Sequence, residues 1–400
     1  MTTKTITRFE AASQALKLKD LRQALYDTGA ILMGNALVNL HGEEHRKRRN
    51  LEARVFRRDF FRYYETEVFP RTLNETLAPF LAAGKMDIVD FGYKVLVNLT
   101  LDFAGIDRPQ KTAEETEDII SMLRLFARTA TLLHSTEDHE EVRQAFLKAL
   151  ARFDAEYFTP SAEHRKVLLA RYANGDIEED ELPRDILTIL LRNEDNIDMT
   201  HDIMVKEIAF FALAGAHTSI NTLTHAMHEI LTWCAEHPED NQKLANEPLF
   251  VQKCVHESIR LHPSSPIAAR RPACPMHMDG EALTESDEVI VDLEAASSDP
   301  DIFGADAASF NPHRETPKGQ KPYGLSFGLG MHSCLGLNLA AGALPQPNTD
   351  SATHHYGTIT MIVRALLDRG VQADPEHLAQ KDTATKRNFW ASYPAIFGEI

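Results

Sequence analysis

The chain has 400 residues, and its 42 Lys and Arg residues against 59 Asp and Glu residues give a net charge of −17. With 43% hydrophobic and 25% charged residues, its composition excludes a disordered, collagen-like or coiled-coil protein. No apolar run approaches the ~20 residues that cross a bilayer, and the longest, Ile208 to Ala216, contains Gly215. The first ten residues lack the apolar segment of a secretory signal, so we expect a cytoplasmic protein without a membrane segment.

Helical periodicity dominates residues 9 to 270, where apolar residues recur three and four apart in three long stretches, Glu117–Thr131, Glu141–Phe158 and Thr200–Ala235. Strands are expected at Asp287–Leu293 and between Ile267 and Met278. Glycine and proline between Asp299 and Gly336 predict a long irregular segment, and a helix should follow it from Leu335 to Leu344. Without a repeat or linker, residues 1–400 are interpreted as one mainly α domain with a small β region and no fused reductase.

The stretch from Thr200 to Ala235 would form a helix roughly 50 Å long at ~1.5 Å per residue. Small and hydroxyl side chains interrupt its apolar face between Ala214 and Ser219. Gly215 lies among them, and glycine costs roughly 1 kcal/mol relative to alanine in a helix interior. Two interpretations remain open: a kink or close packing at this point, or a helix opened at its centre to admit a small ligand beside a hydroxyl.

Four cysteines, Cys234, Cys254, Cys274 and Cys334, have no CxxC spacing, so each is first interpreted as a buried thiol. Cys334 differs in its context. Gly328 and Gly330 allow a tight turn before it, and amide N–H groups at the start of the following helix would stabilise a thiolate. Without a second cysteine nearby, a four-thiolate zinc or iron–sulfur site is excluded, whereas one anionic sulfur suits the axial position of a haem.

At this point the sequence resembles the cytochrome P-450 haem-thiolate monooxygenases of the bacterial soluble type. Their signature, Phe-x-x-Gly-x-His-x-Cys-x-Gly, is matched at every fixed position by Phe327, Gly330, His332, Cys334 and Gly336. The resemblance implies the cytochrome P-450 fold, with haem between the long central helix and the cysteine loop. It also implies that Cys334 is the iron ligand, that Phe327 shields the sulfur, and that His332 contacts a haem propionate.

Three more residues match the family in order. Glu257 and Arg260 fit its Glu-x-x-Arg helix, and Arg314 fits the arginine that completes a buried ion network, so we assign these three a structural role. His45 and Arg49 resemble the family's pair of propionate cations. Arg271 resembles the third propionate cation, with Arg270 as a competing choice.

The basic, aromatic segment from Arg46 to Arg62 could suggest nucleic-acid binding. The strongly negative net charge would repel phosphates at long range, and the apolar residues recur at helical spacing. We therefore expect no nucleic-acid partner.

The middle of the long helix, with Ala214, Gly215, His217 and Thr218, fits the family's oxygen-binding segment except that His217 replaces an acid. Cleavage of dioxygen needs protons, and Thr218 could direct them through a bound water. An imidazole that titrates near neutrality could relay protons, or His217 could merely fill the position while water carries them. A zinc site of His217, His225 and His228 is a further, less favoured interpretation.

Two regions depart from the family. The helix with His45 begins near residue 42, earlier than the family usually has it, so we expect the customary first helix and first strands to be largely absent and the substrate entrance to differ. The helix after Cys334 is broken by Pro345-Gln346-Pro347 and a polar stretch to Gly357, which resembles an insertion on the proximal side.

The predicted activity is insertion of one oxygen atom of O2 into an apolar small molecule by a haem b monooxygenase. No dinucleotide-binding glycine motif and no iron–sulfur cysteine set occurs, so electrons are expected from a ferredoxin or flavodoxin with its reductase. Two alternatives stay open: a peroxide-driven haem peroxygenase, and a haem-binding sensor without turnover.

Overall fold

The computed structural model describes residues 2–398, apart from the side chains at 58 and 59, and its core is helical. The long helices are α1 (Phe9–Lys17), α3 (Gly42–Glu52), α5 (Phe69–Ala83), α6 (Ile88–Ala104), α7 (Ala113–Ala130), α8 (His139–Phe153), α9 (Thr159–Ala173), α11 (His201–Glu236), α13 (Pro248–Leu261) and α17 (Thr358–Leu367). Shorter ones are α2 (Ala30–Met33), α4 (Arg58–Tyr63), α10 (Ile186–Arg192), α12 (Asn241–Asn246), α14 (Leu293–Ser297), α15 (Pro300–Phe303) and α16 (Leu337–Ala341).

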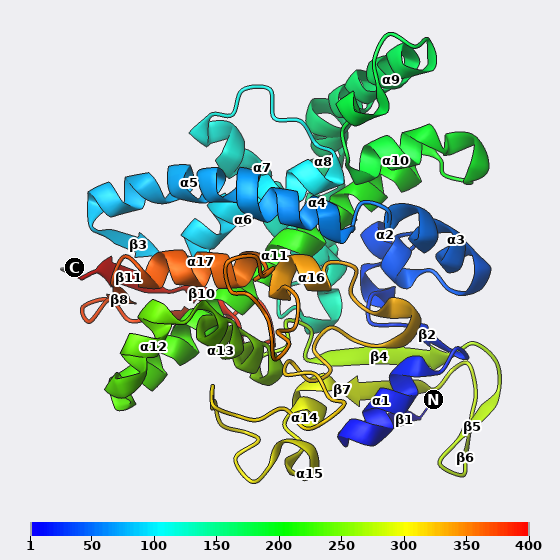
Figure 1. Cartoon of the computed structure of the whole chain (residues 1–400). Coiled ribbons are helices and arrows are strands. Elements are labelled where there is room, and N and C mark those ends of the chain that lie inside the picture. The colour runs from blue at the N-terminus through cyan, green and yellow to red at the C-terminus, as the bar shows by residue number, and fades with distance from the viewer. Residues whose placement is uncertain (1, 399–400) are drawn as a thin grey trace.

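The main sheet has the order β1-β7-β4-β2 and lies at one end of the molecule beside α1 (Figure 1). Its strands are β1 (Thr3–Ile6), β7 (Glu288–Asp292), β4 (Ile267–Pro272) and β2 (Leu21–Gln23), of which only the β1–β7 pair is parallel. The smaller strands are β3 (Lys85–Asp87), β8 (Val371–Ala373), β11 (Pro394–Phe397), β9 (Gln380–Lys381), β10 (Trp390–Ser392), β5 (Met276–Met278) and β6 (Glu281–Leu283). The strand predictions at 287–293 and 267–278 are confirmed.

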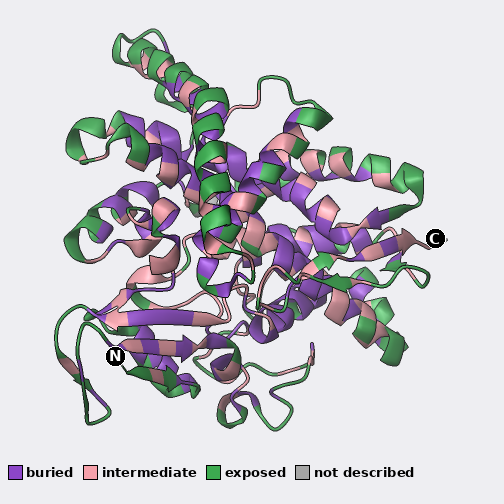
Figure 2. Cartoon of the chain, turned by 180° about the vertical axis from the view of Figure 1, so that it is seen from behind, coloured by how far each residue is buried: buried purple, intermediate pink, exposed green. Residues whose placement is uncertain are grey.

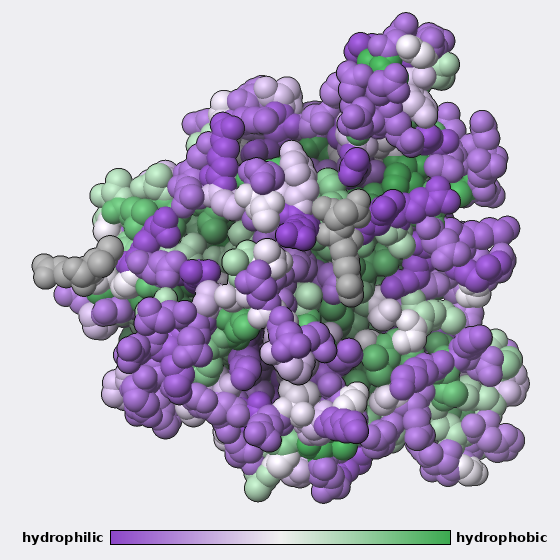
Figure 3. All heavy atoms as spheres, viewed as in Figure 1, coloured by the Kyte–Doolittle hydropathy of each residue, from purple (hydrophilic) through white to green (hydrophobic). Residues whose placement is uncertain are grey.

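The predicted long helix is confirmed as α11, which crosses the centre of the molecule (Figure 1). The Thr200 side chain caps it by accepting a hydrogen bond from the N–H of Ile203. By length and composition α11 could cross a membrane, but half of its most apolar window is buried in the protein, as expected for a core helix. Figure 2 shows that buried residues gather in the interior of the molecule, and Figure 3 shows mainly hydrophilic side chains on the visible face.

Close packing explains Gly215, and no opening of the helix is seen. A Cβ added at Gly215 would lie 2.5 Å from Cγ2 of Thr100, so the glycine lets α6 approach α11. Residues 201–236 form one continuous α-helix through this contact. Of the two interpretations of the small residues, the structure therefore supports close packing.

The forty residues before α3 are more regular than expected. We expected the customary first helix and first strands to be largely absent, but β1, α1 and β2 lie there, and both strands belong to the main sheet. A short N-terminal region relative to the family stays a prediction.

The helix after Cys334 is shorter than predicted. Instead of Leu335–Leu344 it covers Leu337–Ala341 and stops at Gly342, whose φ is +74°. A Cβ added at Gly357 would lie only 2.3 Å from the Gly342 nitrogen. The segment between α16 and α17 therefore forms a loop whose two ends, Gly342 and Gly357, lie in contact. The backbone carbonyl of Ala341, left without a helical partner, accepts hydrogen bonds from Gln252 and His256 on α13.

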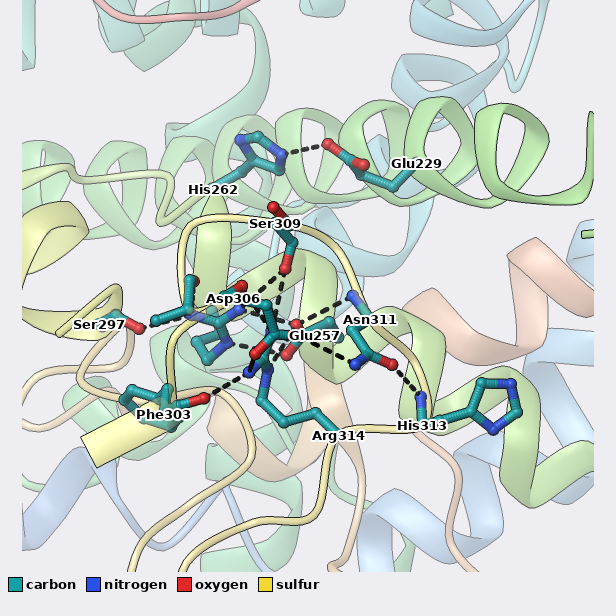
Figure 4. Close-up of polar contacts among 12 residues, drawn as sticks. Glu229, Glu257, His262, Ser297, Phe303, Asp306, Ser309, Asn311, His313 and Arg314 are labelled. Carbon is teal, nitrogen blue, oxygen red and sulfur yellow. Dashed lines mark hydrogen bonds and ion pairs between the residues drawn. The ribbon is translucent and has the colours of Figure 1, made fainter. Parts of the chain in front are cut away.

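A buried ion network holds the irregular segment that follows β7 against α13 (Figure 4). Arg260 forms two hydrogen bonds with Glu257, at 2.7 and 2.8 Å, and donates to the carbonyls of Ser297 and Ala307. Arg314 donates to Glu257 at 3.0 Å and to Asp306 at 2.7 Å. The structural role predicted for Glu257, Arg260 and Arg314 therefore has a clear geometric basis.

Candidate functional site

A cavity of about 320 Å³ lies between α11 and the loop that carries Cys334. Its walls come from α11, α6, the loop between α13 and β4, and the segment around β2, so elements far apart in sequence enclose it. Aromatic side chains dominate one wall, with contributions from Phe56, Phe103, Phe210 and Phe211. The cavity can therefore hold a large, mostly apolar group.

The cysteine loop is shaped by glycines with positive φ. Gly328 and Gly330 have φ values of +63° and +71°, a region that side chains disfavour. A Cβ at Gly330 would also lie 2.7 Å from the carbonyl oxygen of Leu16. The Cys334 N–H donates to the Phe327 carbonyl at 2.9 Å, which closes the loop and exposes the sulfur to the cavity.

The sulfur lies beside groups that favour its anion, but burial is the larger effect, so the pKa of Cys334 lies above its ordinary value. Burial raises the pKa of the Cys334 thiol, while the N–H groups of Gly336 and Leu337 and the guanidinium of Arg49 lower it. Directed N–H groups favour the thiolate, which is the form that binds a metal. The N–H groups at the start of the helix that follows Cys334 therefore lie near the sulfur as expected, although α16 begins two residues later than predicted, and a metal-bound thiolate stays a prediction.

A basic cradle of two arginines and two histidines lies beside the sulfur, formed by His45, Arg49, His332 and Arg270. The rings of His45 and His332 are 4.6 Å apart, and Nε2 of His45 and both nitrogens of His332 are buried without a hydrogen-bond partner among residues 2–398. Burial and the neighbouring arginines lower the pKa of His45 to about 4 and that of His332 to about 3. Buried polar atoms without partners are rare in proteins. The cradle therefore fits an anionic group, as the propionates of a haem would supply.

Arg270, not Arg271, faces this cradle, which corrects our assignment. Successive side chains of a strand point to opposite faces, and in β4 the inward position falls to Arg270. Arg270 donates to Oε1 of Gln23 at 2.6 Å, and the strand register pairs the same two residues. Arg271 points away from the cavity toward Asp27 and Glu288, each at 3.9 Å.

On α11, the predicted residues Ala214, Gly215 and Thr218 line the cavity opposite the cysteine loop. The Thr218 hydroxyl donates to the Ala214 carbonyl at 2.7 Å, so toward the cavity its oxygen can only accept. Ser264, after α13, donates to the Thr218 carbonyl at 2.9 Å and holds the helix to the neighbouring loop. Thr218 is therefore placed to hold a water or a ligand proton.

His217 does not line the cavity, which contradicts its predicted place in the site. Its Nδ1 lies 3.1 Å from the Tyr93 hydroxyl and its Nε2 lies 3.5 Å from Nη2 of Arg387. Burial, together with Arg387 and Arg124, lowers the pKa of His217 to about 3. The imidazole is thus neutral at physiological pH and does not titrate near neutrality as a relay requires.

His225 and His228 also form their hydrogen bonds outside the cavity. His225 bonds to the Asn388 carbonyl, and His228 bonds to the Tyr393 hydroxyl. Within residues 2–398 no group of three or more His, Cys, Asp or Glu side chains could hold a metal ion. His225 and His228 therefore belong to the packing of α11 against the C-terminal segment.

The remaining predicted residues, Phe327, Gly328, His332, Cys334 and Gly336, all line the cavity with His45 and Arg49. Sequence reasoning missed Gln23, Tyr26 and Ser264, which complete its walls. The sequence contained a signal for Gln23. Leu21, Gln23 and Leu25 are spaced two apart and would share one face of a strand, and Gln23 is the polar residue on that otherwise apolar face.

Comparison with known proteins agrees with this geometry. The family profile described as Cytochrome P450 matches residues 6–344. The chain is 24% identical over 314 residues to the "Putative cytochrome P450 YjiB" of Bacillus subtilis (strain 168), covering 77% of this chain and 70% of the relative. CalO2 has a similar structure, with a TM-score of 0.75, 22% identity and coverage of 98% of this chain and 90% of its own.

A second similar solved structure is P450BioI in complex with hexadec-9Z-enoic acid ligated acyl carrier protein. It has a TM-score of 0.73 and 18% identity, and the match covers 98% of this chain and 91% of that chain. These structural likenesses show the fold, and the family profile covers most of the chain. The chain therefore belongs to the cytochrome P450 family, and its reaction class is that of a haem-dependent monooxygenase.

Proposed function

We propose that this protein binds haem b through Cys334 and inserts one oxygen atom of O2 into an apolar small organic substrate. One observation carries the proposal. The sulfur of Cys334 and the hydroxyl of Thr218 come from distant parts of the chain and line the same aromatic cavity, beside two arginines and two histidines with unpartnered ring nitrogens that fit haem propionates.

The protein residues divide the work of the site. Cys334 would hold the iron, and His45, Arg49, Arg270 and His332 would hold the propionates. Bound haem supplies the oxygen activation, which a thiolate ligand favours by donating electron density. Thr218 would orient a water toward the reacting oxygen through its free lone pairs, and the aromatic wall would exclude other water.

Separate proteins would supply the electrons, as proposed from the absence of flavin, nicotinamide and iron–sulfur motifs in the sequence. A ferredoxin or flavodoxin with its reductase is the proposed pair, and the cytoplasm is the proposed location. P450BioI was solved with a hexadec-9Z-enoic acid ligated carrier protein, so fatty acids belong in the first substrate panel with steroids, terpenes and aromatics.

The test begins with the haem-loaded protein. Its reduced carbon monoxide complex should show the long-wavelength Soret band that gives the family its name, and Cys334→His should lose that band. Turnover with NADPH and a surrogate ferredoxin and reductase is then compared with turnover by hydrogen peroxide alone. Product only with the redox proteins supports the proposal, product with peroxide alone supports a peroxygenase, and ligand binding without product in either assay supports a sensor.

A further inference from the structure

An arginine without an acidic partner, partly accessible, lies next to the site. Arg387 is in the loop between β9 and β10, and its guanidinium is packed 4.3 Å from the ring centre of Phe389. Its hydrogen bonds go to neutral groups: Nη2 donates to the Thr131 hydroxyl at 3.0 Å, and Nε donates to the Thr385 hydroxyl at 3.3 Å. The remaining contact is with Nε2 of His217 at 3.5 Å.

These contacts leave the positive charge uncompensated. Among residues 2–398 no carboxylate lies within 4.0 Å of Arg387, and Asp382 acts on it only from farther away. Burial lowers the pKa of the guanidinium to about 10, so Arg387 is charged at physiological pH. Taking a charge out of water without a counter-ion is costly, and charged side chains inside proteins are normally paired.

His217 contacts Arg387 without neutralising its positive charge. Arginine can only donate hydrogen bonds, so Nε2 of His217 accepts and the ring proton lies on Nδ1, facing the Tyr93 oxygen. An imidazole held in this neutral form cannot neutralise Arg387. A carboxylate at the same position would form an ion pair with the guanidinium.

The guanidinium is close to the cavity. His217 directly precedes Thr218, which lines the cavity, and Tyr26, another lining residue, is near enough to Arg387 for the two to interact electrostatically. Arg387 therefore lies just behind the wall on the Thr218 side. An apolar substrate in the cavity could direct an anionic end toward it.

We propose that Arg387 binds a carboxylate group of the substrate, so that this enzyme takes apolar carboxylic acids. A hydrogen bond from an arginine guanidinium to a carboxylate is charge-assisted and therefore strong. Nη1 of Arg387 makes no hydrogen bond to any other residue between 2 and 398, so it is the atom that would donate to the carboxylate. This inference rests on the proposed function, because it assumes that substrate occupies the cavity around Thr218.

The first experiment measures substrate binding to the haem-loaded protein by the Soret shift, using two matched pairs of probes. These are dodecanoic acid with dodecan-1-ol, and naphthalene-2-carboxylic acid with naphthalene-2-methanol. In at least one pair the acid should bind at least about tenfold more tightly than the alcohol. Equal affinities within both pairs would overturn the inference.

Variants then locate the preference. Arg387→Met keeps the apolar stem and should abolish the preference for the acid, whereas Arg387→Lys should keep part of it. Lys386→Ala is the matched control, because Lys386 is the exposed neighbour in the same loop and only its backbone N–H is bonded, to His134. A preference that survives in Arg387→Met would contradict the proposal.

A second pair of variants tests the charge without touching Arg387. His217→Asp would place a carboxylate beside the guanidinium and should lower acid binding to the level of the alcohol. His217→Asn has nearly the same shape without the charge and should keep the preference. Equal acid binding by these two variants would show that the charge of Arg387 does not act on the substrate.

The carbon monoxide spectrum separates this inference from the proposed function. Each variant is compared only if it retains the long-wavelength band, which reports an intact thiolate site. If wild-type protein lacks that band, the haem-thiolate function fails. If the band is present and acids bind no better than alcohols, only the carboxylate inference fails.

Discussion

The buried pair of Glu257 and Arg260 allows a quantitative test of what holds the cysteine side of the molecule together. Arg260 is fully buried and Glu257 is 5% exposed. Glu257→Ala would leave the Arg260 charge without its carboxylate, and breaking a buried pair in this way costs about 3–5 kcal/mol. Since domains unfold with about 5–15 kcal/mol, we expect a large loss of stability and little soluble haem protein.

The free energy of unfolding is measured from urea denaturation of the haem-loaded protein, with haem content determined in parallel. Glu75→Ala is the matched control, because Glu75 forms a similar helical pair with Arg71 on the surface, with 65% and 82% of the side chains exposed. Exposed pairs contribute little, so the control should unfold like the wild type. The reasoning is refuted if Glu257→Ala unfolds at the same urea concentration as Glu75→Ala and keeps its full haem content.

Three further predictions concern α11 and the buried histidines. Thr218→Ala should bind substrate normally but divert electrons into hydrogen peroxide. His217→Asn should couple electrons to product as well as the wild type does, because of these two residues only Thr218 lines the cavity. Measurements of oxygen consumption and of peroxide formation decide this. Gly215→Val should force α6 and α11 apart and lower the thermal midpoint, with partial rescue by Thr100→Ala, since the added Cβ lies 2.5 Å from Thr100; absence of rescue would contradict this contact. Folding lowers the pKa of His225 to about 3 and of His256 to about 4 from 6.5, so the unfolded chain binds more protons between these values. The contribution of these two histidines to the free energy of unfolding should therefore be complete above pH 6.5 and be lost as the pH falls below it. Urea titrations that show no such loss would contradict these directions.

Local sequence alone was sufficient for the cysteine loop. Gly328 and Gly330 have the positive φ values that their residue type permits, and Cys334 follows them at a spacing that puts its sulfur in the cavity. The pair Glu257 and Arg260 is also local, because residues three apart on a helix share a face. The long helix α11 followed from its periodicity and its Thr200 cap.

Tertiary structure decided which of two neighbouring side chains faces the site. Arg270 and Arg271 are chemically equal in sequence, and only the pairing of β4 with β2 and β7 determines that Arg270 points inward. His217 and Thr218 likewise share one motif, but successive helical residues point about 100° apart because an α-helix has 3.6 residues per turn. The packing of α6 and the C-terminal loop on α11 therefore turned His217 toward Tyr93 and Arg387, and left Thr218 on the cavity.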